Sequence, residues 1–496
     1  MQKLSRRTFI RSAAAGAAAV SLPFTARSYA DIVGSNEAVR IGVVGFKGRG
    51  FSHLSAAKKN PGFRIAGLCD VDSKVLEVHA NDFPGTETQT DMRKLFESKG
   101  LDAISIATPN HWHALAAIWA IQAGKDVYVE KPVSHNVSEG RRIVEFARKH
   151  GKMVQAGTQS RSSREGIAKA VEYVQAGNLG KIKVARGLCY KRRPSIGKST
   201  VPLKIPASID FDLWCGPAEM LPIMRKALHY DWHWVWNTGN GDLGNQGIHE
   251  MDVARWFLGE TELSPNILTV GGRVGYIDDG ETPNTLIAYH AYAKAPLLFE
   301  VRGLADKVYP QGVKEQMDKY KGASVGIIIE CEGGHVTVPS YGRAIIHDAD
   351  GKVFKTFSEV DKNPDGSKYD DTAVHFSNFL KACRSRNHED LNADILDGHL
   401  SSALCHTANI SHRLGKMTDP EAIDNTVKTN PVFTEAFERC KQHLIANNVD
   451  ISKEQLTLGM PLTMDPKTET FPGNEAANAM LTRKYRAPYI VPEKVS

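Results

Sequence analysis

Short apolar segments alternate with helical patterns in the part of the chain that follows residue 38. The apolar segments have the length and composition of buried parallel strands, and they cover Val39–Gly45, Arg64–Asp70, Asp102–Ala107 and Asp126–Val129. The helical patterns between and after them lie around residues 50–59, 73–79, 111–123 and 138–150. Because parallel strands joined by helices make right-handed crossovers, this alternation predicts a doubly wound α/β domain over residues 38–158. A ligand crevice is expected at the carboxyl ends of its strands.

The pattern changes near residue 265, where strands follow one another without intervening helices. The predicted strands cover residues 266–276, 285–292, 296–303 and 324–332, with shorter ones within 335–357. Helical patterns return at residues 371–386, 394–414 and 434–446. We therefore predict an α+β domain over residues 159–420 with a large, open, mostly antiparallel sheet. Residues 421–496 are expected to form a helix and an extended arm over the surface or a neighbouring subunit.

The N-terminus has the anatomy of an export signal. Ser5–Arg11 contains a twin-arginine pair, an alanine-rich run follows, and Ser28-Tyr29-Ala30 fits a signal-peptidase site. We expect residues 1–30 to direct twin-arginine export and to be cleaved, so that the mature protein is periplasmic and not inserted in a membrane. An uncleaved or lipid-held form is the alternative.

The formal net charge of +6 is concentrated in that N-terminal segment. Residues 1–30 carry five basic side chains and no acid, so the remainder has a formal charge of +1. With 42% hydrophobic and 24% charged residues, the chain has the composition of a folded globular protein. A nucleic-acid partner is not expected, because such proteins carry a broad basic surface.

A glycine-rich turn directly follows the first strand. It reads Gly45-Phe46-Lys47-Gly48-Arg49-Gly50 and opens the first predicted helix. Gly45 permits a tight turn and Gly50 permits close helix packing, so the N–H groups at the helix start can receive a pyrophosphate. Lys47 replaces the middle glycine of the usual fingerprint, which leaves an incidental glycine-rich turn open as an alternative.

Asp70 ends the second strand, 20 residues beyond Gly50. A carboxylate at this place binds ribose hydroxyls and repels a 2′-phosphate, so NAD is favoured over NADP. A helix cap or a solvated turn residue is the alternative role.

Two further segments follow predicted strands. Thr108-Pro109-Asn110-His111-Trp112-His113 comes after the third strand, where Asn110 can cap the next helix and the segment can contact a cofactor. Glu130-Lys131-Pro132 comes after the fourth, where a lysine facing the crevice could hold a substrate hydroxyl and lower its proton affinity. Capping, packing and surface positions are the alternatives for these residues.

Asn245, His249 and Asp252 lie at spacings of four and three in a predicted helical segment. On a helix they share one face. His249 has the titration range for proton transfer near neutral pH, or it packs a helix. A metal site is not favoured, because a histidine and an aspartate provide too few ligands.

These segments resemble the Gfo/Idh/MocA oxidoreductases, a family named for glucose-fructose oxidoreductase and inositol dehydrogenase. The resemblance extends from about Val39 to Asp419 and is closest in the ATPNHWH, EKP and GxHxxDxxRW stretches. It implies a Rossmann domain coupled to an open-faced sheet domain, with nicotinamide and substrate between them. The family's sheet often pairs with another subunit, so we expect a homo-oligomer.

The resemblance also implies roles for individual residues. Lys131 is implied to assist the reacting hydroxyl, and His249 falls on the acid/base position. The position that usually holds an aspartate is Asn245, which could orient a sugar but not relay a proton. The other implied contacts are, for the cofactor, Gly45–Gly50, Asp70, Thr108, Pro109, Asn110, His113, Glu130, Lys131 and Gln159, and for the substrate, Arg161 and Asp252, although Asp252 could instead anchor the helix. Tyr190, which ends a predicted strand into the second domain, is a further candidate for substrate contact. Trp232 lies in an aromatic segment, residues 229–236, which is either a wall that stacks a sugar ring or a packed loop.

The sequence therefore predicts an exported NAD-dependent oxidoreductase that acts on a sugar, cyclitol or polyol. Since an exported enzyme has no free NAD pool to draw on, we expect a tightly held cofactor that is regenerated on the protein. Redox-neutral cleavage of glycosides is the first alternative, and a non-catalytic sugar- or nucleotide-binding protein is the second.

Overall fold

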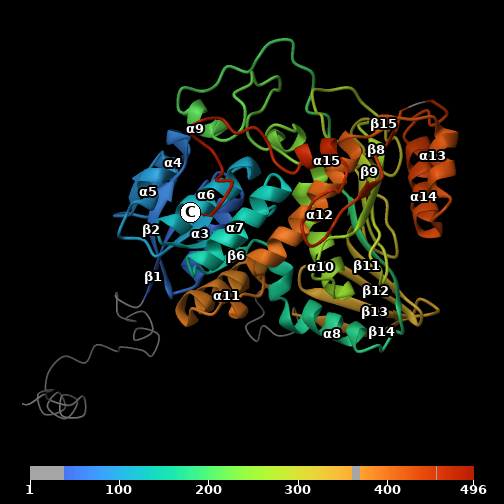
Figure 1. Cartoon of the computed structure of the whole chain (residues 1–496), viewed down its shortest axis with the longest axis horizontal. Coiled ribbons are helices and arrows are strands. Elements are labelled where there is room, and N and C mark those ends of the chain that lie inside the picture. The colour runs from blue at the N-terminus through green and yellow to red at the C-terminus, as the bar shows by residue number, and fades with distance from the viewer. Residues whose placement is uncertain (1–37, 360–368, 454, 496) are drawn as a thin grey trace, which may run out of the picture. The chain divides into compact units, whose positions relative to one another are not determined.

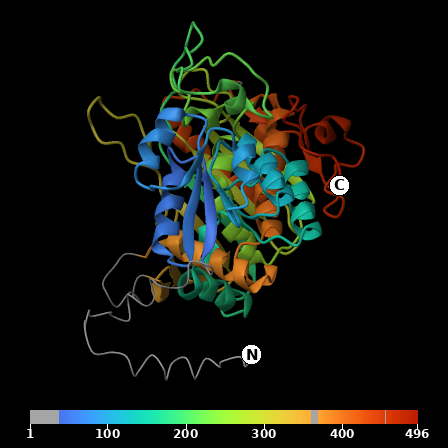
Figure 2. The ribbon, with the colours of Figure 1, turned by 90° about the vertical axis from the view of Figure 1, so that its left-hand side faces the viewer.

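The first domain contains a parallel sheet with the strand order β3-β2-β1-β4-β5-β6 (Figures 1 and 2). The structure is a computed structural model that describes residues 38–359, 369–453 and 455–495, so the predicted export signal lies outside the described residues. The strands are β1 Val39–Val44, β2 Phe63–Cys69, β3 Glu87–Gln89, β4 Ala103–Ile106, β5 Asp126–Val129 and β6 Val154–Ala156. The predicted doubly wound fold is confirmed, and the order reverses between β1 and β4, where such sheets bind their ligands.

Helices cover both faces of this sheet. They are α3 Arg49–Lys59, α4 Ser73–Ala80, α5 Met92–Phe96, α6 His113–Gln122 and α7 Val137–Lys149. Alternation along β5 shows the two layers, because Val127 packs in the cluster that contains α6 and α7, whereas Tyr128 packs in the cluster that contains α3. Both layers exclude water from the strands, which explains their uninterrupted apolar sequences.

Helix α11 (Asp371–Ser385) completes the α3 side of the parallel sheet, although it lies in the stretch that the sequence assigned to the second domain. The ring of Phe376, which is fully buried, lies 4.4 Å from the ring of Tyr128 on β5. Hydrophobic periodicity predicts this helix but not the sheet that it covers.

The second sheet has the strand order β14-β13-β12-β11-β7-β10-β9-β8-β16-β15, and β17 also pairs with β8. Its strands are β7 Ile182–Tyr190, β8 Asn266–Gly272, β9 Thr285–His290, β10 Leu297–Arg302, β11 Val325–Cys331, β12 Gly334–Ser340, β13 Arg343–Asp348, β14 Val353–Ser358, β15 Lys416–Met417, β16 Thr457–Leu458 and β17 Leu462–Thr463. Strands β7 and β10 pair in parallel, and the other pairs are antiparallel. The predicted, mostly antiparallel sheet is confirmed.

Helices also lie on both faces of the second sheet. Phe299 and Val301 of β10 belong to the core with α8 (Lys169–Gln175), α10 (Ile248–Leu258) and α12 (Ile395–Arg413). Leu298, which directly precedes Phe299 and points to the opposite face, packs instead with α13 (Pro420–Val427) and α14 (Pro431–Ala446). The helices α13 and α14 lie beside the sheet in Figure 1. This chain's own C-terminal helices therefore cover part of the face that the sequence left available for packing.

The C-terminal arm crosses from the second domain to the first. It contains the short helix α15 (Glu475–Ala479) and ends beside the first domain (Figure 1). Tyr489, which is 2% exposed, packs edge-on against Trp112 with 5.4 Å between the ring centroids. The arm thus packs over its own chain, which is one of the two arrangements that the sequence suggested.

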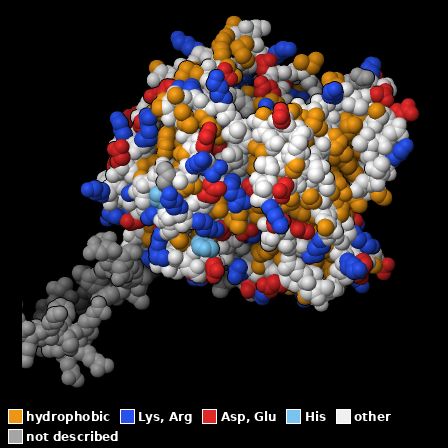
Figure 3. Space-filling view, in the orientation of Figure 1, with side chains coloured by type: hydrophobic (Ala, Val, Ile, Leu, Met, Phe, Trp, Pro, Cys, Tyr) orange, Lys and Arg blue, Asp and Glu red, His pale blue; other side chains and the backbone are white. Residues whose placement is uncertain are grey.

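Acidic and basic side chains are interspersed on the face shown in Figure 3. In the part of the chain that the structure describes, no helix has the length and hydropathy needed to cross a bilayer.

Candidate functional site

A cavity of about 610 Å³ lies at the carboxyl ends of β1, β2, β4 and β5. The first domain lines it with Val44–Arg49, Cys69–Val71, Met92, Ala107–Pro109, Trp112, His113, Glu130, Lys131 and Gln159. The facing wall comes from Trp214, His229, Tyr230, Trp232, His233, Asn245, Gln246, His249 and Tyr341. Ligand sites of this size usually bury most of a small molecule, and this one lies at the point where the strand order reverses.

The glycine turn has the close packing that the sequence predicted. Gly45 has φ +75°, a conformation that favours glycine, and an added Cβ at Gly50 would lie 1.9 Å from the Gly45 carbonyl oxygen. A Cβ at Gly48 would meet nothing within 4 Å. Gly45 and Gly50 therefore hold the turn against α3. Of the six turn residues, only Gly50 does not line the cavity.

The first turn of α3 faces the cavity with basic side chains beside it. Lys47 and Arg49 are both exposed, so Lys47 does not fill the turn in place of the missing glycine. The residue before the helix, Gly48, supplies no side-chain cap. Free N–H groups at a helix start, with the positive end of its dipole, form a binding place for a pyrophosphate. These residues fit a dinucleotide.

Asp70 joins the ends of β1 and β2. Its carboxylate, 8% exposed, accepts hydrogen bonds from the N–H groups of Phe46 at 3.1 Å and Asp72 at 3.0 Å. Burial raises the pKa of Asp70 above its ordinary value, although the two N–H groups oppose that shift. The side chain lines the cavity at the place where the sequence predicted a ribose contact.

Glu130 is the buried acid of the cleft. Its Oε1 accepts hydrogen bonds from Arg49 Nε at 2.8 Å and Gln159 Nε2 at 3.2 Å, and it lies 3.0 Å from His53 Nε2. Its other oxygen, Oε2, accepts the N–H of Lys131 at 3.1 Å. Burial alone would raise the pKa of Glu130, but Arg49 and His53 outweigh it and hold that pKa well below the ordinary value.

Lys131 connects the two domains across the cavity. Its Nζ donates a hydrogen bond to the carbonyl oxygen of Asn245 at 2.5 Å. Burial lowers the pKa of Lys131 below its ordinary value, although the neighbouring Glu130 raises it. The ammonium has three N–H groups, and the contact with Asn245 uses one of them. The remaining donors are available to an oxygen of a ligand.

His249 lies at the start of α10 and lines the same cavity. It is 6% exposed, and its ring centroid lies 5.0 Å from that of Tyr341. Burial lowers the pKa of His249 well below its ordinary value, and the positive charge of Lys131 adds to this effect. The imidazole is therefore neutral near pH 7 and can accept a proton.

Asn245 and Asp252 do not share a face as the helical spacing predicted. Residues Leu243–Gly247 form a π turn, and the α-helix begins only at Ile248, which changes the side-chain register. Asn245 lines the cavity, and its Nδ2 lies 3.4 Å from Asp242 Oδ1. Asp252 is fully buried and lies outside the cavity lining.

Arg161 and Asp252 bind each other. The Nε atom of Arg161 lies 2.9 Å from both carboxylate oxygens of Asp252, and Ser401 Oγ donates to the same carboxylate at 2.7 Å. A buried carboxylate needs such compensation, so both side chains are held away from the cavity. The structure does not bring these two predicted substrate residues into the site.

Two other predicted contacts also lie outside the cavity lining. Tyr190 is 1% exposed, and its hydroxyl donates to Glu300 at 2.7 Å. Asn110 does not cap the next helix, which has no side-chain cap; its Oδ1 accepts no hydrogen bond in the described structure, and its Nδ2 donates to the side-chain oxygen of Asn240 at 2.6 Å. By contrast, Thr108, Pro109 and His113 line the cavity, and the two ring nitrogens of His113 lie 2.6 Å and 2.8 Å from the carbonyl oxygens of Pro132 and Thr108.

Several lining residues carried no sequence signal that identified them. Tyr341 comes from the turn between β12 and β13, and Gln246 lies beside Asn245 in the π turn. His53 supports Glu130 from α3 and carries no motif. The aromatic segment around Trp232 was predicted as a wall or a packed loop, and the ring of Trp232 stacks on His233 with 3.6 Å between centroids. Both rings line the cavity.

Metal-ligating residues do not gather in this structure. Within residues 38–359, 369–453 and 455–495, no group of three or more His, Cys, Asp or Glu side chains is placed to hold a metal ion.

A glycine turn at a helix start that faces a lysine and a neutral histidine is the arrangement of an NAD-binding oxidoreductase. The chain belongs to the Gfo/Idh/MocA family. Residues 39–158 match the family model described as oxidoreductase family, NAD-binding Rossmann fold. Residues 165–289 match the model described as oxidoreductase family, C-terminal alpha/beta domain. The chain is therefore an enzyme of an oxidoreductase family.

Individual relatives agree with this assignment. An inositol 2-dehydrogenase of Corynebacterium glutamicum is 30% identical over 244 residues, which cover 47% of this chain and 68% of the relative. A glycosyl hydrolase family 109 protein of Shewanella baltica is 28% identical over 172 residues, which cover 30% of this chain and 38% of that protein. The structure of a levoglucosan dehydrogenase in complex with NADH shares the fold, with a TM-score of 0.55 and 18% identity over 75% of this chain and 96% of that one.

The glycine turn provides a test of the cradle. Gly50→Ala should lower the melting temperature and NAD affinity, because the new Cβ would overlap the Gly45 carbonyl oxygen. Gly48→Ala is the matched control and should keep the melting temperature of the cofactor-free protein, since its Cβ meets no atom. Thermal unfolding of both variants measures the difference, and equal melting temperatures would contradict the packing described.

Proposed function

We propose that this protein is an exported NAD-dependent oxidoreductase that oxidises a hydroxyl-bearing carbon of a sugar, cyclitol or polyol. The observation that carries the proposal is that Lys131 and His249, from different domains, line one cavity beside the glycine turn and Asp70. The similarity to an inositol 2-dehydrogenase supports a polyhydroxylated substrate. Asp70 supports NAD over NADP, because a carboxylate there favours ribose hydroxyls over a 2′-phosphate.

Lys131 holds and deprotonates the reacting hydroxyl in this proposal. Its lowered pKa makes the neutral amine more accessible near physiological pH than an ordinary lysine would allow. NAD, when bound, supplies the acceptor for the hydride that leaves the carbon. The contact from Lys131 Nζ to the Asn245 carbonyl oxygen fixes the amine against the second domain, where the substrate is oriented.

His249 supplies a second base in the same cavity. Because its imidazole is neutral, it can accept a hydrogen bond or a proton from the substrate. Asn245 orients substrate hydroxyls through its amide and moves no proton. Trp232 and His233 supply aromatic surface for the apolar face of a sugar ring.

Redox-neutral cleavage of a glycoside is the second candidate. It requires one base for the hydroxyl that is oxidised and another for the neighbouring C–H, which oxidation makes acidic. Lys131 and His249 provide two such groups, and the similarity to a glycosyl hydrolase family 109 protein favours this candidate. The products separate the two reactions, since cleavage releases a free sugar and net oxidation gives a ketosugar or lactone.

Export and cofactor retention can be tested together. The twin-arginine pair at Arg6 and Arg7 is the basis of the export proposal, and an exported enzyme must carry its NAD with it. We expect to find the protein in the periplasmic fraction. Denaturation of the purified protein should release NAD(H), which mass spectrometry detects, and the native protein should turn over polyols or glycosides. Cytoplasmic retention contradicts export, and protein without NAD(H) and without measurable affinity for it contradicts the oxidoreductase assignment.

The pH dependence tests the role of Lys131. A protonated amine cannot accept the hydroxyl proton, so kcat/KM for oxidation should rise with pH. The midpoint of this rise should lie below the pKa of an ordinary lysine. Lys131→Met should lower kcat/KM by about 10² to 10⁴-fold and abolish the rising limb. Lys58→Met, at an exposed position on α3, is the control. A rising limb that persists in Lys131→Met would show that another group is the base.

A further inference from the structure

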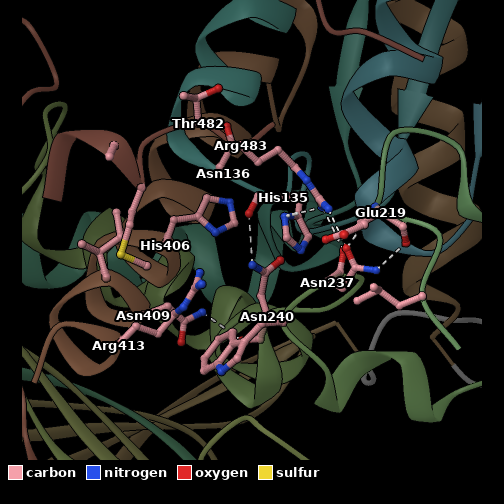
Figure 4. A pocket seen from close by; sticks show the side chains of 15 residues that line it. His135, Asn136, Glu219, Asn237, Asn240, His406, Asn409, Arg413, Thr482 and Arg483 are labelled. Atoms are coloured by element: carbon pink, nitrogen blue, oxygen red, sulfur yellow. Dashed lines mark hydrogen bonds between the residues drawn. The ribbon is translucent and has the colours of Figure 1, made fainter. Parts of the chain in front are cut away.

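A second cavity, of about 360 Å³, lies where the C-terminal arm meets α12 and the loops around residues 135 and 219–240 (Figure 4). It shares no lining residue with the cleft described above. Below we call it the arm pocket. Its size falls within the range of small-molecule sites.

Two guanidinium groups line the arm pocket without a carboxylate partner. Arg483 of the arm donates from Nη1 and Nη2 to the backbone and side-chain oxygens of Asn237, at 2.9 and 2.8 Å. Arg413, at the end of α12, lies over the ring of Trp236 with 5.1 Å to its centroid. Among the described residues neither arginine forms a close ion pair, although the charges of Glu139 and Glu219 act on Arg483 and that of Glu281 acts on Arg413. The pocket therefore presents positive charge that a bound anion would compensate.

Two buried side chains of α12 leave hydrogen-bonding atoms unused in the arm pocket. His406 is 3% exposed and binds Ser134 through Nε2, whereas its Nδ1 has no partner in the described structure. Asn409 is 5% exposed and donates from Nδ2 to the Asn240 carbonyl oxygen, whereas its Oδ1 has no partner there. Buried polar atoms usually have a hydrogen-bond partner, so these two atoms can bind polar groups of a molecule in the pocket. Both residues line the pocket, as Figure 4 shows.

These lining residues form one stripe of α12. His406, Asn409, Ile410 and Arg413 follow the spacing of three and four that places side chains on a single helix face. Burial lowers the pKa of His406 to about 3, so its ring is neutral and offers hydrogen bonds rather than charge. The stripe thus combines one cation with two neutral polar groups that suit hydroxyls.

We propose that the arm pocket binds a small hydroxylated carboxylate, a sugar acid in chemical class. The guanidinium group of Arg413, which lies beside Asn409 in Figure 4, would receive the carboxylate, and Asn409 Oδ1 and His406 Nδ1 would bind hydroxyls. Glu219 also lines the pocket and is exposed, and its negative charge favours a singly charged ligand over a phosphate dianion.

Asn240 connects the arm pocket to the cleft. Its Nδ2 donates to the carbonyl oxygen of His135 at 3.1 Å, four residues after Lys131, and its Oδ1 accepts the amide of Asn110. A ligand in the arm pocket would therefore affect the position of two segments that border the cleft. One is the segment that follows Lys131, and the other is the segment around Asn110. The site and its ligand do not depend on which reaction the cleft performs.

Calorimetric titration of the purified full chain with D-gluconate tests the proposal, with D-glucose and inorganic phosphate as comparisons. We expect one saturable site for gluconate, with glucose and phosphate each at least about tenfold weaker, since the site needs both the charge and the hydroxyls. Phosphate binding as tight as gluconate, or the absence of saturable gluconate binding, would overturn the proposal.

Variants locate the binding. Thr482→Glu adds a negative charge at an exposed lining residue, whereas Thr482→Gln has nearly the same shape without the charge. Gluconate affinity should fall about fivefold or more in Thr482→Glu relative to Thr482→Gln. Arg413→Gln should weaken it by about tenfold, and Arg64→Gln, at an exposed position on β2, should not. Equal affinities in the two Thr482 variants would overturn the proposal.

Lys131→Met separates the arm pocket from the cleft, because only the cleft contains Lys131. Gluconate affinity should be unchanged in this variant. A loss of gluconate affinity in Lys131→Met would place gluconate in the cleft and overturn the proposed arm-pocket site. That result would not bear on whether the wild-type protein is an oxidoreductase.

Discussion

The buried carboxylate of Glu130 is the interaction on which the geometry of the cleft depends. It joins α3 through Arg49 and His53, the turn after β6 through Gln159, and the backbone of Lys131 at the end of β5. The carboxylate of Glu130 is almost fully buried, and a buried carboxylate is stable only with such partners, so these segments hold one another in register. The helix that receives the nucleotide and the strand that supplies the lysine are thereby tied to a single side chain.

Burial then gives the cleft its chemistry. Lys131 and His249 are both shifted toward their neutral forms, because burial penalises positive charge, and the charge of Lys131 adds to the shift at His249. An ordinary lysine in water is almost fully protonated at neutral pH and accepts protons poorly. The facing of the two domains thus makes the amine of Lys131 a more available base and keeps the imidazole of His249 neutral.

Much of this arrangement could be predicted from the chain, because the cradle is local. The glycine turn, Asp70 and Lys131 each follow a strand, and parallel strands bring their carboxyl ends to one edge. Long-range packing could not be predicted in the same way. Tyr341 reaches the cleft from a hairpin turn, and α11 covers the parallel sheet from far along the chain.

Asp252 shows why helical spacing alone misplaced a residue. The spacing from His249 was correct, but a π turn precedes the helix, and Arg161 lies where it can neutralise the carboxylate. Both facts depend on the local backbone and on a distant segment, which a single sequence does not specify. The sequence predicts that the residues of the α12 stripe share one helix face. It does not predict that they line a pocket, because the C-terminal arm that closes the pocket comes from a distant part of the chain.

The central claim is that Glu130 fixes the position of Lys131 and raises its pKa against the larger, opposite effect of burial, and Glu130→Gln measures it most directly. The amide keeps the size of the side chain but removes the negative charge that raises the pKa of Lys131. In this variant the rising limb of the kcat/KM profile should move to lower pH, with kcat reduced more than substrate KM is changed. A limb at the wild-type pH with unaltered kcat would contradict the account.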